Sequence, residues 1–125
     1  MKHFLLSIPF LALLACHSSR SQPTEEQMQK IRFDLSGLDE DGLLGPPGGK
    51  VALDYEFCIP RDEKYLREVE RIDPTVKAQT ARGRIGCSRD QYLCLGHTRQ
   101  ENYKEVLYRL AGLAYVEKIE RAFFE

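Results

Sequence analysis

Three cysteines and one histidine in the second half of the chain are the residues best suited to carry chemistry. Cys58, Cys87 and Cys94 offer thiolates, and His97 offers an imidazole nitrogen, so together they could bind a soft metal ion. The alternative is one structural disulfide, one buried free cysteine and a partly buried histidine, and the sequence favours this alternative. A cysteine hydrolase would need His97 within reach of a thiolate and a third group to orient it. No motif in the chain indicates such a triad.

Two sets of carboxylates are also candidates for chemistry. Asp54 and Glu56 are two residues apart and would share one face of a strand. Such a pair is more typical of a solvated face than of an acid–base pair. The stretch 39–42, Asp-Glu-Asp-Gly, hints at a calcium loop, but it lacks the ligand spacing and the terminal Glu of an EF-hand. A solvated turn is the better interpretation.

Basic residues gather in residues 74–99, where Asp90 is the only acidic residue. The set comprises Lys77, Arg82, Arg84, Arg89 and Arg99. Arg82, Arg84 and Arg89 could frame a site for phosphate, lipopolysaccharide, acidic cell-wall groups or an acidic partner. The alternative is a solvated edge strand, whose positive charges discourage strand-to-strand aggregation.

The N-terminus has the features of an export signal. Lys2 supplies a positive charge, and the apolar run from Phe4 to Ala15 is shorter than the roughly 20 residues of a membrane-spanning helix. The run ends in residues 13–16, Leu-Leu-Ala-Cys, which resemble the bacterial lipobox. This resemblance implies cleavage before Cys16 and lipid on that cysteine. Since His17 is not Asp, it also implies placement in the outer membrane if the host has two membranes. An ordinary signal peptide with an incidental cysteine is the alternative.

The remaining chain is small. Without residues 1–15 it has 110 residues and a net charge near −2, because Lys2 is the only charge removed. That length suits a single domain, and the near-neutral charge gives no support for nucleic-acid binding. Disulfides persist in exported proteins, so with Cys16 lipidated we expect one bonded pair and one free cysteine.

Residues 16–49 are expected to form a tether and a loop. Thr24 and Gln27 could cap a short, poorly packed helix that runs to Phe33. Residues 34–49 are dense in turn-forming residues. The folded domain is therefore expected to span residues 50–125.

A strand and a helix open this domain. Every second residue from Val51 to Ile59 is apolar, which is the period of a half-buried strand, and Pro60 ends it. Asp62 can cap the helix that follows, and residues 73–74, Asp-Pro, stop it. The apolar face of this helix comprises Tyr65, Leu66, Val69 and Ile72.

The second half of the predicted domain contains two less regular strands, a helix and a final segment. Residues 75–86 have weak strand character, and residues 91–97 alternate between two sides. Leu93, Leu95 and His97 lie on one side; Tyr92, Cys94 and Gly96 lie on the other. Thr98 and Glu101 form a capping box for a helix that ends near Gly112. Residues 115–124 fit a helix or a strand, and the alternation of their apolar residues favours a strand.

The predicted order is β-α-β-β-α-β, the α+β arrangement of ferredoxin-like folds, with two helices on one face of a four-stranded antiparallel sheet and the other face open. Cys58 would end the first strand and Cys87 would precede the turn at the same end of the sheet. We therefore expect a Cys58–Cys87 disulfide. Cys94 would share the open face with Cys58 and stay free. His97 would face away from Cys94, which weakens the metal interpretation.

Residues 55–60, 83–87 and 96–103 resemble a small bacterial domain family without known activity. The resemblance covers about residues 50–125 and implies no reaction. We expect a lipid-anchored envelope protein facing the periplasm, and a non-catalytic binding or structural module without a cofactor. Its open sheet face or basic edge would bind an envelope protein or an anionic ligand rather than nucleic acid. The alternative is a soft-metal-binding or thiol-redox protein that uses Cys58, Cys87 and Cys94.

Overall fold

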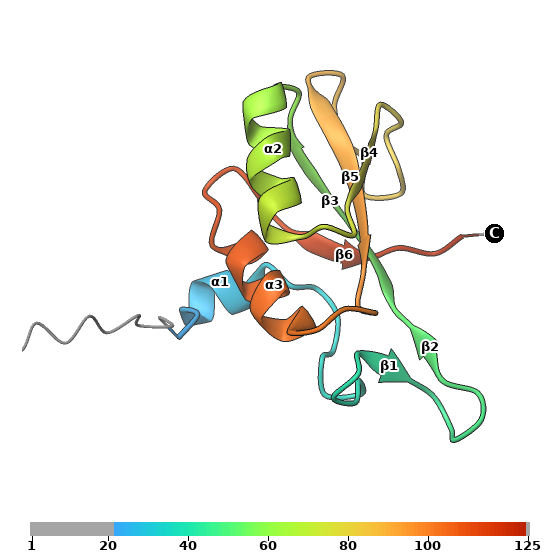
Figure 1. Cartoon of the computed structure of the whole chain (residues 1–125). Coiled ribbons are helices and arrows are strands. Elements are labelled where there is room, and N and C mark those ends of the chain that lie inside the picture. The colour runs from blue at the N-terminus through green and yellow to red at the C-terminus, as the bar shows by residue number, and fades with distance from the viewer. Residues whose placement is uncertain (1–21, 125) are drawn as a thin grey trace, which may run out of the picture.

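The computed structural model describes residues 22–124 as a mixed α+β protein (Figure 1). The described residues form three helices and two antiparallel sheets, of two and four strands. The predicted signal peptide, Cys16 and the first residues of the tether lie outside the described residues. The elements are α1 (Glu25–Gln29), β1 (Leu43–Leu44), β2 (Val51–Ala52), β3 (Asp54–Pro60), α2 (Glu63–Ile72), β4 (Lys77–Gln79), β5 (Gln91–His97), α3 (Tyr103–Ala111) and β6 (Ile119–Arg121).

The larger sheet has the order β4-β5-β3-β6, and every neighbouring pair is antiparallel. The central pair sets the register, because all seven residues of β3 face residues of β5. Tyr55, Phe57 and Ile59 point to one face, as their alternation predicts, and all three are fully buried. They pack with apolar residues of α2 and α3, including Val69, Ile72, Leu107 and Leu110. Burial of apolar surface between the helices and this face of the sheet therefore forms the core.

The first helix of the predicted domain begins and ends as expected. Asp62 is the N-cap of α2, and its carboxylate accepts a hydrogen bond from the backbone N–H of Lys64 at 2.9 Å. This bond satisfies one of the free donors at the start of a helix. The helix ends at Ile72, and Asp73 adopts an extended backbone conformation.

The expected capping box of α3 is wrong, although the helix itself is present. Its N-cap is Asn102, which has a left-handed backbone (φ 55°) and makes no side-chain cap. Thr98 is instead fully buried. Its hydroxyl accepts a hydrogen bond from Leu53 N–H at 2.9 Å and donates one to Gly42 O at 2.5 Å. The Thr-x-x-Glu pattern failed because Thr98 joins the end of β5 to two earlier segments.

Two predicted strands are much shorter than expected. The stretch 75–86 contributes only the three residues of β4, and 115–124 contributes only the three residues of β6. In the first stretch, the chain turns away from the sheet after Gln79. The choice of a strand over a helix near the C-terminus is confirmed for Ile119–Arg121, which pair with Tyr55–Phe57 of β3.

The residues before Lys50 are more than a tether. The predicted Thr24–Gln27 capping box is present, but α1 ends at Gln29 rather than Phe33. Leu38 is buried in the core, and Ile31, Phe33, Leu35 and Leu44 pack against it. The packed part of the chain therefore begins well before Lys50, because apolar residues that were predicted to lie in a tether or loop pack against the core.

The other face of the sheet is only partly open, contrary to the predicted arrangement. Leu93 and Glu56 lie on this face, and their exposed fractions are only 3% and 5%. The connection between β4 and β5 covers them, and Figure 1 shows it on the side of the sheet away from α2 and α3. The connection carries Arg82, Arg84 and Arg89 on its exposed side, and its Cys87 lies against the sheet.

Candidate functional site

The β4–β5 connection, residues 80–90, is held to the sheet by a disulfide. Cys58 of β3 and Cys87 are bonded, with Cα atoms 5.6 Å apart. This confirms the predicted pairing. Cys87 is fully buried, whereas Cys58 is half-buried. The bond fixes the C-terminal part of the connection against the strand at the centre of the sheet.

A buried carboxylate fixes the middle of the connection. Glu56 Oε1 accepts a hydrogen bond from the backbone N–H of Ile85 at 2.9 Å. Gly83 has a φ of +64° and lies so close to Leu93 that a Cβ there would be 2.9 Å from both of its methyl carbons. Only glycine fits this backbone and this contact without strain. Glu56 is thus part of the fold, and the expectation that it is solvated is wrong.

The turn that carries the arginines is ordered by its own backbone. The carbonyl oxygen of Arg82 accepts hydrogen bonds from Gly86 N–H at 3.2 Å and Cys87 N–H at 2.8 Å. Arg82, Arg84 and Arg89 are all exposed. Exposed guanidinium groups therefore extend from a backbone that is fixed at both of its contacts with the sheet.

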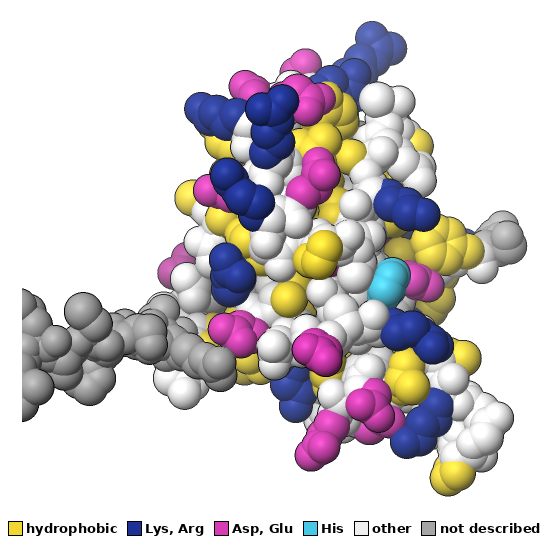
Figure 2. All heavy atoms as spheres, in the orientation of Figure 1, with side chains coloured by type: hydrophobic (Ala, Val, Ile, Leu, Met, Phe, Trp, Pro, Cys, Tyr) yellow, Lys and Arg dark blue, Asp and Glu magenta, His cyan; other side chains and the backbone are white. Residues whose placement is uncertain are grey.

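The charge of this loop contrasts with that of the neighbouring surface. Figure 2 shows Lys and Arg side chains interspersed with Asp and Glu over much of one face of the molecule. Residues 77–90 instead carry Lys77 and the three arginines against Asp90 alone. The loop is thus a local concentration of positive charge on a chain whose net charge is −1. Arg99 lies beyond the end of β5, so it is outside the loop.

The four residues of the possible metal site do not come together. Cys94 is opposite Phe57 on the face that packs against the helices, and His97 is opposite Asp54 on the other face. No group of three or more potential ligands occurs within residues 22–124. The expectation that Cys94 shares a face with Cys58 is wrong, because Cys58 is opposite Leu93 and the two cysteines have opposite parity.

Cys94 is free and fully buried. Burial raises the pKa of its thiol to about 12, and the carboxylates of Glu70 and Asp73 add to this effect. The thiolate is the reactive form of cysteine. Cys94 therefore behaves as a small apolar residue at neutral pH, as predicted from the sequence.

A buried hydrogen-bond network was missed by the sequence analysis. Asp73 is fully buried, and its carboxylate accepts hydrogen bonds from the Tyr55 hydroxyl, the Thr75 hydroxyl at 2.6 Å and the Gln100 amide at 3.1 Å. Burial, and then the Asp73 carboxylate, raise the pKa of Tyr55 above its ordinary value. The Asp-x-Thr turn at the end of α2 was the available signal. This network joins α2, β3 and the start of α3, and its role is structural.

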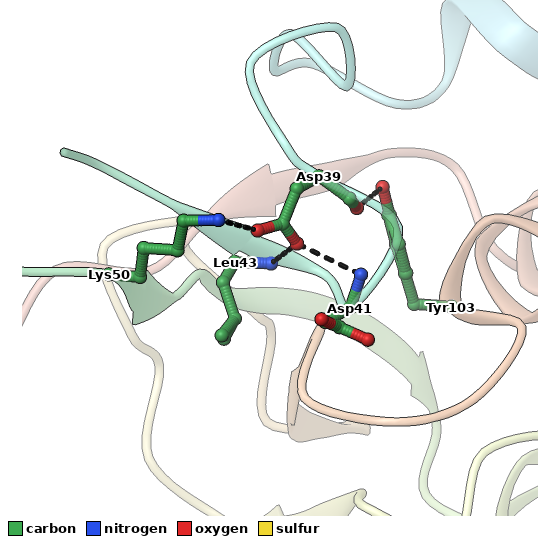
Figure 3. Close-up of polar contacts among 5 residues, drawn as sticks. All are labelled: Asp39, Asp41, Leu43, Lys50 and Tyr103. Carbon is green, nitrogen blue, oxygen red and sulfur yellow. Dashed lines mark hydrogen bonds and ion pairs between the residues drawn. The ribbon is translucent and has the colours of Figure 1, made fainter. Parts of the chain in front are cut away.

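The Asp39 turn explains the acidic stretch that hinted at calcium. One oxygen of the Asp39 carboxylate contacts Lys50 Nζ at 2.7 Å, and the other accepts hydrogen bonds from Asp41 N–H and Leu43 N–H (Figure 3). The hydrogen bond from Lys50 is the main reason that the pKa of Asp39 is lowered. Tyr103 donates to the Asp39 carbonyl at 2.8 Å. The carboxylate thus closes the β1–β2 hairpin, as expected for a turn.

A hollow lies beside α3, with a volume of about 1310 Å³. Its charged lining residues are Asp39, Glu40, Lys104, Glu105 and Arg109. Because this lining mixes both signs, the hollow has no clear preference for an anion or a cation. The β4–β5 loop remains the better candidate.

Comparisons with known proteins assign this chain to no family. No protein-family model matches the chain, and no curated protein or solved structure is significantly similar to it. Within the described residues, no helix has the length and apolar character needed to span a membrane.

Proposed function

We propose that this chain is a lipid-anchored protein of the cell envelope whose α+β domain is a non-catalytic binding module. The lipobox-like residues 13–16 support the anchor, with lipid on Cys16. His17, which is not Asp, favours outer-membrane placement in a host with two membranes. The basic β4–β5 loop supports binding of an anionic partner. We also propose that the domain adopts the ferredoxin-like arrangement, because β3-α2-β4-β5-α3-β6 follows its element order and β4-β5-β3-β6 its order of strands.

The observation that carries the binding proposal is the double attachment of a loop without regular structure. The Cys58–Cys87 bond and the Glu56–Ile85 hydrogen bond hold residues 83–87 on the sheet. A loop that is already ordered loses less conformational entropy on binding than a flexible one. Rigid presentation of Arg82, Arg84 and Arg89 is thus the feature that distinguishes this surface from the other charged surfaces of the domain.

The chemistry of arginine indicates the class of ligand. A guanidinium group is planar and always charged, and it donates paired hydrogen bonds to a carboxylate or phosphate. Three such groups on one loop fit a ligand with several anionic groups, such as an acidic polymer or an acidic protein segment of the envelope. Exposed charge contacts of this kind weaken as salt screens them.

Binding is tested with two polyanions, polyglutamate and inorganic polyphosphate, which separate carboxylate from phosphate recognition. Replacement of Arg82, Arg84 and Arg89 together by Gln should weaken binding at least tenfold and remove most of its salt dependence. The matched control replaces three exposed arginines outside the loop, Arg32, Arg67 and Arg71, by Gln. Both variants should keep the melting temperature, because exposed substitutions change stability by only about 0.5 kcal/mol or less. Equal losses in both variants would assign binding to overall charge.

The anchor is tested separately. Cys16→Ser should abolish incorporation of labelled fatty acid and leave uncleaved or mislocalised precursor, because the lipid is attached through the cysteine sulfur. Normal processing and membrane retention of this variant would contradict the lipoprotein proposal without affecting the binding test.

A further inference from the structure

The N-terminal side of the described chain lies on the helix face of the larger sheet. A Cβ on Gly112, at the end of α3, would lie 3.5 Å from the side-chain amide of Gln27 in α1. Lys30 Nζ, just after α1, donates a hydrogen bond to Leu113 O at 3.2 Å. Gln22, the first described residue, lines the hollow beside α3. The N-terminal segment therefore joins the domain next to α3.

The β4–β5 loop lies on the opposite face of the sheet. Leu107 of α3 packs with Tyr55 on the buried side of β3. The loop instead contacts the other side, where Gly83 approaches Leu93 and Ile85 N–H donates to the Glu56 carboxylate. Figure 1 shows the same arrangement, with α1 and α3 on one side of the sheet and the connection between β4 and β5 on the other. The whole sheet thus separates the arginines of the loop from the point where the N-terminal segment enters.

The domain has three layers in this direction, namely the helices, the sheet and the β4–β5 loop. A helix with its side chains is about 10–12 Å across, and packed layers lie about 10 Å apart. The three layers together therefore give a thickness of roughly 25–30 Å between the outer side of α3 and the guanidinium groups of the loop.

The chain between the proposed anchor and the domain is shorter than this thickness. Cys16 and Gln22 are six residues apart, and a fully extended chain advances at most about 3.6 Å per residue. Whatever its conformation, this segment therefore spans no more than about 22 Å. It is too short to pass around the domain and lay the loop face-on against the bilayer that holds Cys16.

We propose that the β4–β5 loop faces away from the anchoring membrane and that its partner is an anionic polymer beyond the surface of that membrane. This inference rests on the lipid anchor and the binding role proposed above, and it adds the location of the partner. The alternative partner is the headgroups of the anchoring membrane, because anionic lipids also attract arginine. The length of the segment 16–22 decides against them, whereas a polymer that extends from the opposite side can reach the loop.

Energy transfer from a fluorescent label to a dye-labelled lipid tests the orientation of the full, lipidated chain in vesicles. Ala81→Cys places the label in the loop and leaves all three arginines, whereas Glu26→Cys places it on the anchor side; both positions are exposed. The Cys58–Cys87 bond and the burial of Cys94 keep the described native cysteines from reacting with the label.

Transfer should be at least twofold greater from position 26 than from position 81. We expect this result on phosphatidylcholine vesicles and also on vesicles that contain one quarter phosphatidylglycerol. Equal or greater transfer from position 81 on the anionic vesicles would overturn the proposal, because the loop would then lie on the headgroups. The measurement uses no polyanion, so its failure is distinct from failure of the binding test.

A longer N-terminal segment tests the reason for the orientation. Ten alternating Gly and Ser residues inserted before Gln22 add roughly 35 Å of reach, which exceeds the thickness of the domain. On anionic vesicles, this insertion should increase transfer from position 81 at least twofold. Replacement of Arg82, Arg84 and Arg89 by Gln in the lengthened chain should remove the increase, and the control triple variant of the binding test should retain it. An insertion without effect, or an increase that does not depend on the loop arginines, would overturn the proposal.

Discussion

Removal of the Cys58–Cys87 bond should cost this domain a large part of its stability. The bond joins residues 29 positions apart in the sequence. In the chain-entropy description, closing a loop of that length lowers the entropy of the unfolded chain, which corresponds to about 3.6 kcal/mol at 25 °C. A domain of roughly 100 residues has an unfolding entropy near 0.2 kcal/mol/K, so the melting temperature should fall by about 17 °C.

The test compares Cys58→Ala/Cys87→Ala with the unmodified chain by thermal and urea denaturation. Alanine is suitable because Cys87 is fully buried, and a serine hydroxyl there would need a partner. Cys94→Ala is the control for removing a cysteine that forms no bond. Reductant should lower the melting temperature of the unmodified chain toward that of the double variant and leave the double variant unchanged. A fall below about 1 kcal/mol would refute the reasoning, because unfolded-state entropy would then not be the main effect of the bond.

Two further predictions test the core, one by substitution of a glycine and one by the reactivity of a buried cysteine. Gly96→Ala would place a Cβ 2.6 Å from the buried Tyr55 ring and should destabilise the domain by about 1–3 kcal/mol in urea melts, whereas Gly37→Ala, with nothing within 4 Å, should change little. Equal effects at both glycines would contradict the packing argument. Cys94 should resist iodoacetamide at pH 8 until the chain unfolds, and mass spectrometry reports this directly. Burial raises the pKa of this thiol from 9.0 to about 12, so deprotonation favours the unfolded chain and the stability of the domain should fall as pH rises through that range. Rapid labelling of the folded chain would contradict this assignment.

The regular parts of the sequence predicted the matching parts of the structure. The alternation of residues 53–59 identified the buried face of β3, and Asp62 identified the start of α2. The predicted strand is divided, however, because Val51 lies in β2 and is 53% exposed. The cysteine pairing followed from placing the two residues at one end of the sheet, and that placement needed only the order of the elements. The first two successes depend on a periodic pattern and a local cap, and the third depends on the element order that these patterns define.

The wrong predictions concern residues whose hydrogen-bond or packing partners are far away in the sequence. Thr98 has the spacing of a helix cap, but its hydroxyl bonds Leu53 and Gly42, which are far away in the sequence. Residues 30–33 were assigned to a tether and residues 34–38 to a turn-rich loop, yet Leu38 is buried and Ile31, Phe33 and Leu35 pack against the core. Local patterns contain no information about such partners, so these contacts could not be found from the sequence.

The covering of the second sheet face was not predicted, although the sequence contained a signal for it. Strand 91–97 has apolar residues on both sides, with Tyr92 and Cys94 on one and Leu93 and Leu95 on the other. A strand that borders water on one face alternates apolar with polar residues, whereas one buried on both faces has a nearly continuous apolar run. The run therefore required a cover for the second face. Residues 80–90 provide this cover, because Gly83 permits close approach to Leu93, and Cys87 and Ile85 attach the loop to the sheet. The same burial that stabilises this loop also orders the arginines on its outer side, so one structural requirement accounts for both the missing open face and the candidate binding surface.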